Sequence, residues 1–361
     1  MYVIVTRSFP PEVGGMQNLM WGLTCSIAKY NMVKVFADFH ENYKEHDQKV
    51  SFSIDRVGGI KLLRKHRKSY LVNEFIKKNK NVSCVIADHW KSLELIKTSK
   101  KKICLIHSKE INHTVGSLLN KRLIKSTNKA NYIIANSNFT KNLAIKVGID
   151  ESKIKVIFPG INKPKSINIK YKKEADIIFG DSFPKIITVA RLDKRKGHDK
   201  ILMVIKNLKI KFPKIKYVSI GFGDEEKNLK KLAKELKIEN EVIFLKHHDE
   251  NIKLALIEKS NLFLMPSRIE KKSVEGFGIS FMEAASYSVG SIGGKDGGAS
   301  DAITHNKSGL ICDGNDLNSI YESVLYFFEN EKYIEFGKTA SKISENFHWD
   351  KIVKNYLKLI N

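Results

Sequence analysis

The sequence predicts an α/β protein with two doubly wound parallel-sheet domains that face each other across a cleft. Short runs rich in β-branched residues alternate with helix-like stretches, as in a parallel sheet that is buried on both faces. This alternation occurs twice, and 361 residues are enough for two separate hydrophobic cores. Between the two series lies a stretch rich in Lys, Asn, Pro and Ser, residues 159–184, which we interpret as an interdomain connection.

The expected strands are short apolar runs, and each is followed by a helix-like stretch. In the first domain they are residues 2–6, 33–37, 82–87, 102–106, 132–135 and 154–158. In the second domain they are residues 185–190, 215–220, 241–245 and 262–266. Ligands of such sheets bind beyond the carboxyl ends of the strands, so motifs that directly follow a strand are the candidates for function.

Composition excludes several classes of protein. No run of about 20 apolar residues occurs, so no transmembrane helix is expected. The cysteines are scattered without a CxxC pair, which argues against a zinc site or a disulfide framework: Cys25, Cys84, Cys104 and Cys312. The chain begins with strand-like residues rather than a signal peptide, so a reducing cytoplasm is the expected compartment.

The formal net charge is +24, and the excess is larger in the first 160 residues than in the rest of the chain. Three interpretations compete: a compositional bias toward Lys, attraction to an anionic membrane surface, and nucleic-acid binding. Lys greatly outnumbers Arg, and aromatic residues are not interleaved with the charges. This pattern argues against a nucleic-acid partner and leaves the first two interpretations open.

The stretch VEGFGISFMEA, residues 274–284, carries the strongest functional signal. Glu275 and Glu283 stand at its two ends, and Gly276-Phe277-Gly278 precedes an apolar run that resembles a helix start. Unpaired N–H groups at a helix start favour phosphate oxygens, and a carboxylate two turns later can accept hydrogen bonds from sugar hydroxyls. The segment predicts a clamp for a nucleotide diphosphate, although its glycines could also form only a tight turn.

A second candidate follows the first strand of the second domain. In VARLDKRKGHDKIL, residues 189–202, Arg191 and Lys196 bracket a short loop, and Gly197 opens a helix. Two cations at such a loop are suited to neutralising a diphosphate and the charge that grows on it as a leaving group. The alternative is an exposed basic loop.

The corresponding loop of the first domain is SFPPEVGGMQ, residues 8–17. Gly14 and Gly15 open a helix there, which again suits a phosphate, although a plain strand-to-helix turn would use the same residues. His107 follows the strand 102–106, among polar neighbours, and is a candidate cleft residue, although a lone histidine is more often structural.

Two glycine-rich segments complete the candidates. In GFGDEEKNL, residues 221–229, Glu226 replaces the third glycine of the dinucleotide fingerprint, so a nicotinamide site is rejected. In residues 293–303, Asp296, Gly297 and Gly298 could supply N–H groups and a hydroxyl acceptor. The chain contains no DxD pair for a metal-bound sugar nucleotide, so neither a metal nor a cofactor is expected.

In this order the motifs resemble the family-4 retaining glycosyltransferases of the GT-B fold. The FPPEVGGMQ and EGFGISFMEA segments are most similar to the lipid-directed members, such as the phosphatidylinositol mannosyltransferases. The resemblance implies an N-terminal acceptor-binding domain over residues 1–165 and a C-terminal domain over residues 166–345 that binds the nucleotide sugar. A last helix, within residues 346–361, would pack back on the first domain.

The resemblance also implies roles for residues. Arg191 and Lys196 would bind the donor diphosphate, Glu275 would lie beside the transferred sugar, and Glu283 would bind the ribose. The backbone of Phe277, Gly278 and Ile279 would contact phosphate, and His107 would lie near the reacting sugar. The implied catalytic set is His107, Arg191, Lys196 and Glu275; the donor set also includes Gly14 and Gly15. Lys246-His247-His248 stand where the family often has glycine, so the base of the donor, in UDP or GDP, stays open.

The expected reaction is the transfer of a hexose, of the glucose or mannose class, from a UDP- or GDP-hexose to a membrane lipid or lipid-linked acceptor. The resemblance implies retention of configuration, and no carboxylate nucleophile can be assigned. Alternatives are a soluble transferase that acts on a polysaccharide or small glycoside, a sugar-nucleotide epimerase, and an inactive sugar-nucleotide-binding protein.

The hypothesis of a lipid acceptor rests on residues 59–80, where basic and apolar residues are interleaved, as in a helix that lies on anionic lipid. The expected membrane contacts are Lys61, Arg64, Lys65, Arg67 and Lys68. A second basic stretch, residues 121–129, lies in the same domain. The alternative is an ordinary amphipathic helix packed on the sheet. The expected location is cytoplasmic, on the inner face of the cell membrane.

Overall fold

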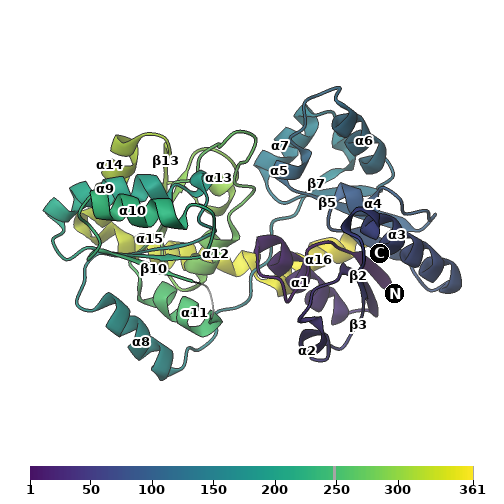
Figure 1. Cartoon of the computed structure of the whole chain (residues 1–361), viewed down its shortest axis with the longest axis horizontal. Coiled ribbons are helices and arrows are strands. Elements are labelled where there is room, and N and C mark those ends of the chain that lie inside the picture. Colours follow the sequence, from purple (N-terminus) through teal and green to yellow (C-terminus); the bar gives the residue numbers. More distant parts are fainter. Residues whose placement is uncertain (247–248, 361) are drawn as a thin grey trace. The chain divides into compact units, whose positions relative to one another are not determined.

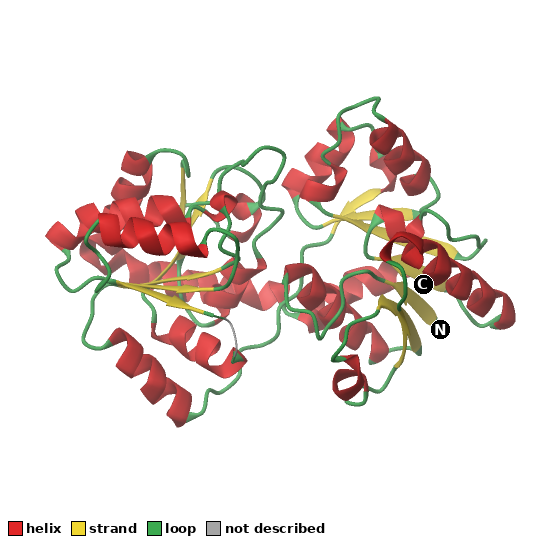
Figure 2. Cartoon of the chain, viewed as in Figure 1, coloured by secondary structure: helices red, strands yellow, loops and turns green. Residues whose placement is uncertain are grey.

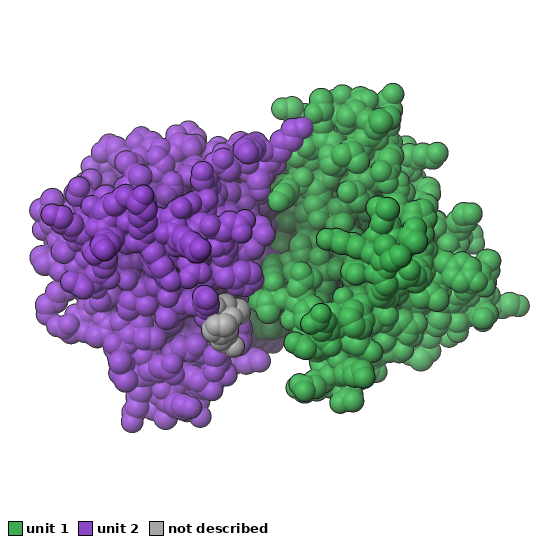
Figure 3. Space-filling model, viewed as in Figure 1, with its two compact units in different colours: residues 1–162, 347–361 green, residues 163–346 purple. Residues whose placement is uncertain are grey.

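The computed structural model describes residues 1–246 and 249–360, which form two compact units (Figure 3). Unit 1 is Met1–Asn162 together with the segment that begins at Phe347, and unit 2 is Lys163–Asn346. Each unit contains one parallel β-sheet, and helices cover both faces of each sheet (Figure 2). The predicted α/β fold with two Rossmann-like domains is therefore confirmed.

The sheet of unit 1 has the order β3-β2-β1-β4-β5-β6-β7 in the described part of the chain, and all its pairs are parallel. Its strands are β1 (Tyr2–Val5), β2 (Val33–Asp38), β3 (Ser53–Val57), β4 (Cys84–Ala87), β5 (Lys101–Ile106), β6 (Tyr132–Ala135) and β7 (Ile154–Val156). The core strands are almost fully buried because helices cover both of their faces.

The helices of unit 1 are α1 (Gly15–Ala28), α2 (Tyr43–Asp47), α3 (Lys61–Lys78), α4 (Trp90–Leu93), α5 (Ser108–Ile111), α6 (Leu118–Thr127), α7 (Asn138–Lys146) and α16 (Trp349–Ile360). Side-chain caps define some of their starts: Ser117 accepts a hydrogen bond from the N–H of Asn120. The last helix, α16, packs on α1. Trp349 lies against Gly22 and Gly160, where a Cβ atom at either glycine would overlap the indole ring.

The sheet of unit 2 has the order β10-β9-β8-β11-β12-β13, again with parallel pairs. Its strands are β8 (Lys185–Val189), β9 (Lys216–Ile220), β10 (Val242–Leu245), β11 (Leu262–Met265), β12 (Ser291–Gly294) and β13 (Gly309–Cys312). Its helices are α8 (Ile169–Phe179), α9 (His198–Lys211), α10 (Glu226–Glu235), α11 (Glu250–Lys259), α12 (Ile279–Ser286), α13 (Ala299–Ala302), α14 (Leu317–Phe328) and α15 (Lys332–Ser344). Helices α9, α10 and α14 lie on one face of the sheet, and α8 and α11 on the other (Figure 1).

Each expected strand corresponds to an observed one, but β3, β12 and β13 were not expected. The break between the two units, at Asn162, falls within residues 159–184, which were interpreted as an interdomain connection, but this stretch also contains a helix that was not expected, α8. Asn168 caps this helix by accepting a hydrogen bond from the N–H of Lys170, and Ala175 and Phe179 are buried where α8 packs on α11.

In each sheet the strand order reverses beside the first strand of the unit, between β1 and β4 and between β8 and β11. The loops that follow such strands meet at the carboxyl edge of the sheet, which is where doubly wound folds bind ligands. No helix within residues 1–246 and 249–360 combines the length and the apolar character that are needed to cross a bilayer.

Candidate active site

In unit 2, the loops after β8 and β11 bring one carboxylate and two cations together. Lys196 Nζ contacts Glu275 Oε2, and Arg195 Nη1 donates to the same oxygen at 2.8 Å. These side chains are only 11–12% exposed. Burial alone would raise the pKa of Glu275, but the charges of Lys196 and Arg195 outweigh burial and lower this pKa to about 2. Glu275 is therefore ionised at neutral pH.

The backbone of these two loops explains why the cluster forms. Gly197 ends the loop in the left-handed region, at φ 79°, where glycine is favoured, and serves as the N-cap of α9. The N–H of Arg268, after β11, donates to the carbonyl of Arg195 at 2.9 Å. The guanidinium of Arg268 pairs with both oxygens of Asp199, at 2.9 Å each. This bidentate pair fixes the loop after β11 to the first turn of α9.

Arg191 lies in the same loop but projects into solvent. Its side chain is 60% exposed, and its Nη2 lies 3.3 Å from Asp193 Oδ2. Its carbonyl is 3.3 Å from Nε2 of the buried His198, whose pKa is lowered to about 4, mainly by burial, so the imidazole is neutral. The position of the Arg191 backbone is thus set from inside the unit, while the guanidinium is accessible to a ligand.

The glycines of the GFG segment support this loop. A Cβ atom at Gly221 would overlap the carbonyl of Ala190, and one at Gly223 would overlap the carbonyl of Leu192. The N–H of Leu192 donates to the carbonyl of Phe222 at 3.0 Å. The segment therefore packs against the loop that carries Arg191.

The predicted clamp forms the start of α12. Gly278, at φ 87°, is its N-cap, and a Cβ atom there would press on the ring of Phe281. Ile279 is the first helical residue, and Phe277 is buried. The N–H of Gly298 donates to the carbonyl of Glu275 at 2.9 Å, so the glycine-rich segment after β12 supports the backbone of the clamp.

Glu283 is the fifth residue of α12, about one turn from the start of the helix rather than the two turns that were expected. Its Oε2 is 3.6 Å from Nζ of the buried Lys253, and its side chain is 24% exposed. His247 and His248, which were considered for the base of the donor, lie outside the described residues.

In unit 1, Asp88 joins the loops after β1 and β4. Its buried carboxylate accepts hydrogen bonds from Thr6 Oγ1 at 2.9 Å, from the N–H of Arg7 at 2.7 Å and from Ser92 Oγ at 2.6 Å. Burial opposes ionisation, but the charges of Lys68 and Arg7 lower the pKa of Asp88 below its ordinary value. These bonds hold the loop that leads to Gly14 and Gly15.

His107 follows β5 and contacts this same region, with its Nε2 3.2 Å from the carbonyl of Asp88. Burial lowers its pKa, so it is neutral at pH 7. One turn later, Glu110 lies 2.8 Å from Nε2 of His89 and 3.3 Å from Nη2 of Arg7. Arg7, Asp88 and Glu110 were not among the residues predicted from the sequence, although Arg7 and Asp88 directly follow the expected strands 2–6 and 82–87.

Gly14 and Gly15 take the expected place at the start of α1. The N–H of Asn18 donates to the carbonyl of Gly14 at 2.9 Å, so the helix begins here. A Cβ atom at Gly15 would meet no heavy atom within 4 Å. Gly15 therefore has free space beside it into which a ligand can fit.

The prediction that Lys68 contacts a membrane is wrong. Its side chain is 3% exposed, and Nζ donates to Asp38 Oδ1 and to the carbonyl of Thr6, both at 2.6 Å. Arg64 and Lys65 are partly buried and pair with Asp38 at 3.4 Å and Glu94 at 2.8 Å. Lys61 and Arg67 are exposed.

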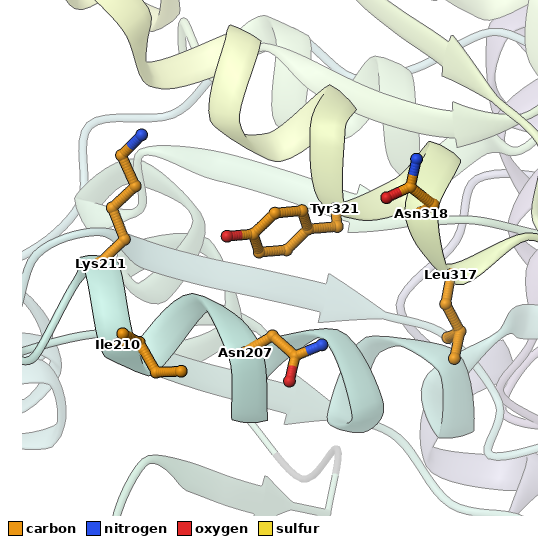
Figure 4. A pocket seen from close by; sticks show the side chains of 6 residues that line it. All are labelled: Asn207, Ile210, Lys211, Leu317, Asn318 and Tyr321. Atoms are coloured by element: carbon orange, nitrogen blue, oxygen red, sulfur yellow. The ribbon is translucent and has the colours of Figure 1, made fainter.

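A separate hollow of about 730 Å³ lies in unit 2 between α9 and α14 (Figure 4). Its lining residues are Asn207, Ile210, Lys211, Leu317, Asn318 and Tyr321. None of the predicted site residues lines it, and the charge at its rim comes from one lysine. Among residues 1–246 and 249–360, no group of three or more His, Cys, Asp or Glu is arranged to hold a metal ion.

Comparison with known proteins covers almost the whole chain. Residues 13–163 match the model of Glycosyltransferase Family 4, and residues 170–347 match that of Glycosyl transferases group 1. A GDP-mannose-dependent alpha-(1-6)-phosphatidylinositol monomannoside mannosyltransferase of Mycolicibacterium smegmatis is 22% identical, over 89% of this chain and 87% of its own. An N-acetyl-alpha-D-glucosaminyl L-malate synthase of Bacillus anthracis is 26% identical, over 65% and 66%. The structure of Anabaena Alr3699/HepE in complex with UDP has the same fold, with a TM-score of 0.82, 16% identity and coverage of 99% and 98%.

Proposed function

The chain belongs to the family-4 glycosyltransferases of the GT-B fold, whose donor is a nucleotide sugar, and we propose that it is a retaining, metal-independent hexosyltransferase with a lipid or lipid-linked acceptor. The donor is a UDP- or GDP-hexose of the glucose or mannose class. A lipid acceptor is supported by the similarity to the mannosyltransferase of Mycolicibacterium smegmatis, whose name includes a phosphatidylinositol monomannoside.

The observation that carries the proposal is the cluster around Glu275. Three of the four cations of one loop, Arg191, Arg195 and Lys196, pair with only two carboxylates, Asp193 and Glu275. The excess of positive charge lies beside the glycine-rich start of α12, which also favours phosphate. This combination fits a donor diphosphate without a metal ion, because fixed cations and N–H groups supply the charge that a metal would supply.

The state of Glu275 favours a same-face reaction. Its Oε2 is engaged by two cations, which makes the carboxylate a poor nucleophile and a good positioning group for the sugar. In the proposed reaction the bond between C1 of the sugar and the phosphate oxygen breaks, and the acceptor oxygen bonds to C1 on the same face. The acceptor proton passes to the departing phosphate oxygen, and the cations stabilise the charge on the diphosphate.

The lipid acceptor is supported by an exposed apolar surface in unit 1, which we call the apolar rim. It consists of Ile60, Leu62, Leu63, Val115, Leu118 and Leu119, whose exposed fractions range from 41% to 86%. Ile60, Leu62 and Leu63 lie at the start of α3, Leu118 and Leu119 begin α6, and Val115 lies in the loop before α6. Glu94 holds the two helices together, with Lys65 at 2.8 Å and Arg122 at 2.9 Å. The exposed side chains of Lys61, Arg67 and Lys121 add positive charge beside the rim.

This composition suits an anionic bilayer surface. Apolar residues on a helix start can insert at the level of the headgroups, and each nearby Lys or Arg contributes about 1 kcal/mol on an anionic membrane. The corrected membrane contacts are therefore Lys61, Arg67 and the apolar rim, while Lys68 and the paired Arg64 and Lys65 hold α3 on the domain.

Vesicle flotation tests the acceptor class. The wild-type protein should float with vesicles that contain phosphatidylserine, and less so as salt is added. The double variant Leu62→Ser/Leu118→Ser should remain at the bottom of the gradient. Ile177→Ser is a matched control, because Ile177 on α8 of unit 2 is 82% exposed and lies outside the rim. Absence of wild-type flotation at low salt would contradict the membrane acceptor, and transfer to a water-soluble glycoside would favour a soluble transferase.

A further inference from the structure

Lys253 is a buried lysine that contacts a carboxylate of the proposed donor site. Its side chain is 4% exposed, and its Nζ lies 2.7 Å from Glu250 Oε1 and 3.6 Å from Glu283 Oε2. Burial disfavours its charged form, but the two carboxylates outweigh burial and raise the pKa of Lys253 above its ordinary value. Lys253 is therefore a fixed positive charge inside unit 2.

The two carboxylates that Lys253 contacts are not equivalent. Glu250 lies three residues earlier on the same helix, α11, and its side chain is 57% exposed. Glu283 comes from α12, and its side chain is 24% exposed. The pair between Lys253 and Glu283 thus links the helix after β10 to the helix after β11, whereas the pair with Glu250 is local.

A carboxylate that accepts hydrogen bonds from sugar hydroxyls works best when it is ionised and held in one orientation. Without the ammonium group, Glu283 would lose the opposite charge beside its Oε2 and would be free to turn away. The contact to Lys253 uses Oε2 of a carboxylate that is still partly open to solvent. Such a carboxylate can accept from a ligand while the lysine holds it.

Resting on the proposed donor site, we propose that Lys253 is a positioning residue that fixes the Glu283 carboxylate for the hydroxyls of the donor ribose. By holding this acceptor, Lys253 sets the preference of the enzyme for ribonucleotides over deoxyribonucleotides. A site built to bind a hydroxyl discriminates against an analogue that lacks it, because the polar group of the site is then left without its partner.

The test is calorimetric titration of the whole protein with UDP, GDP and their 2′-deoxy forms. Wild type should bind one ribonucleotide at least about tenfold more tightly than its deoxy form. Lys253→Met should weaken ribonucleotide binding about tenfold and leave deoxynucleotide binding nearly unchanged, so that the preference is lost. In the transfer reaction this variant should raise KM for the donor more than it lowers kcat.

Two variants separate positioning from general packing. Lys253→Arg keeps the positive charge and should restore most of the preference for ribonucleotides. Glu250→Gln removes the local partner on α11 and should leave the preference as in wild type. Thermal unfolding without nucleotide shows whether each variant is folded under the conditions of the titration.

The outcomes distinguish this proposal from the proposed function. A wild-type protein that binds neither UDP nor GDP would overturn the proposed function itself. Tight ribonucleotide binding with an unchanged preference in Lys253→Met would overturn only the role of Lys253. Equal binding of ribo- and 2′-deoxynucleotides by wild type would also overturn that role, because Glu283 would then not act on the 2′-hydroxyl, and there would be no preference for Lys253 to set.

Discussion

Replacing Lys196 with methionine removes one of the two cations on Glu275 and preserves the length and the apolar part of the side chain. In the structure Lys196 is buried, and its Nζ contacts Glu275 Oε2 and lies 3.6 Å from Met265 Sδ. A methionine fits such surroundings because a thioether fills apolar space without a charge. The change therefore tests the charge of Lys196 more than its volume.

The surroundings of Lys196 set the expected losses of turnover and of unfolding free energy in this variant. Loss of one group that stabilises developing charge lowers turnover by about 100-fold. Breaking a buried ion pair costs about 3–5 kcal/mol when the remaining charge is left unpaired. Glu275 keeps Arg195 at 2.8 Å, so we expect a smaller loss of unfolding free energy, about 2 kcal/mol.

The assay measures the UDP or GDP released from a saturating nucleotide hexose, together with urea unfolding of each variant. In Lys196→Met/Glu275→Gln, the carboxylate that lost a partner is made neutral, so stability should recover while turnover stays low. Lys194→Met is the matched control, because Lys194 is an exposed residue of the same loop, and its turnover should stay near wild type.

Turnover near wild type in a folded Lys196→Met variant would refute the assignment of Lys196 to the leaving diphosphate. Recovery of both stability and turnover in the double variant would show that Lys196 acts only by neutralising Glu275. Either result would leave the fold intact and would remove the proposed role of Lys196 in the loop after β8.

Two further predictions concern Glu275 and the segment that supports it. Gly297, at φ 98°, has no room for a Cβ atom beside the carbonyl of Glu275, so Gly297→Ala should cost more than the about 1 kcal/mol expected from positive φ alone. Gly116→Ala, at φ 80° with no atom within 4 Å, should show only that smaller cost in urea unfolding, and equal losses would contradict the clash. The pKa of Glu275 is lowered from 4.5 to about 2, so its ion pairs stabilise the fold above about pH 4.5, and this stability is lost as the pH falls toward 2. Over that range wild type should lose about 3 kcal/mol more unfolding free energy than Glu275→Gln, and parallel acid curves would contradict the pairing.

The fold was predictable because its central strands are short apolar runs buried on both faces. The edge strand β3 was missed because its sequence contains the charged residues Asp55 and Arg56, which interrupt an apolar run. In the structure Asp55 pairs with Lys34 at 2.6 Å and Arg56 pairs with Asp47, at the edge of the sheet. Strand β12 was missed because it ends in two glycines, where the absence of a side chain lets Gly294 approach the backbone of Ser267.

The candidate site was predictable where function depends on spacing along the chain, as for Glu275 and Glu283. Partners that come from elsewhere were not predictable. Nothing in the local sequence indicated that Arg195 would turn toward Glu275, 80 residues away. Likewise, Lys68 lies in a stretch rich in Lys and Arg and was therefore expected on the surface. In the structure its ammonium group is buried and donates a hydrogen bond to Asp38 on β2.

The most direct measurement follows a radiolabelled hexose from UDP- or GDP-hexose into a lipid extract, with anionic vesicles and EDTA present. Wild type should transfer label to the organic phase at a rate that EDTA does not change, and Lys196→Met should do so about 100-fold more slowly. Loss of the transfer in EDTA, with recovery on addition of a divalent cation, would contradict the metal-independent diphosphate site. Label that stays in the aqueous phase with every anionic lipid offered would contradict the lipid acceptor.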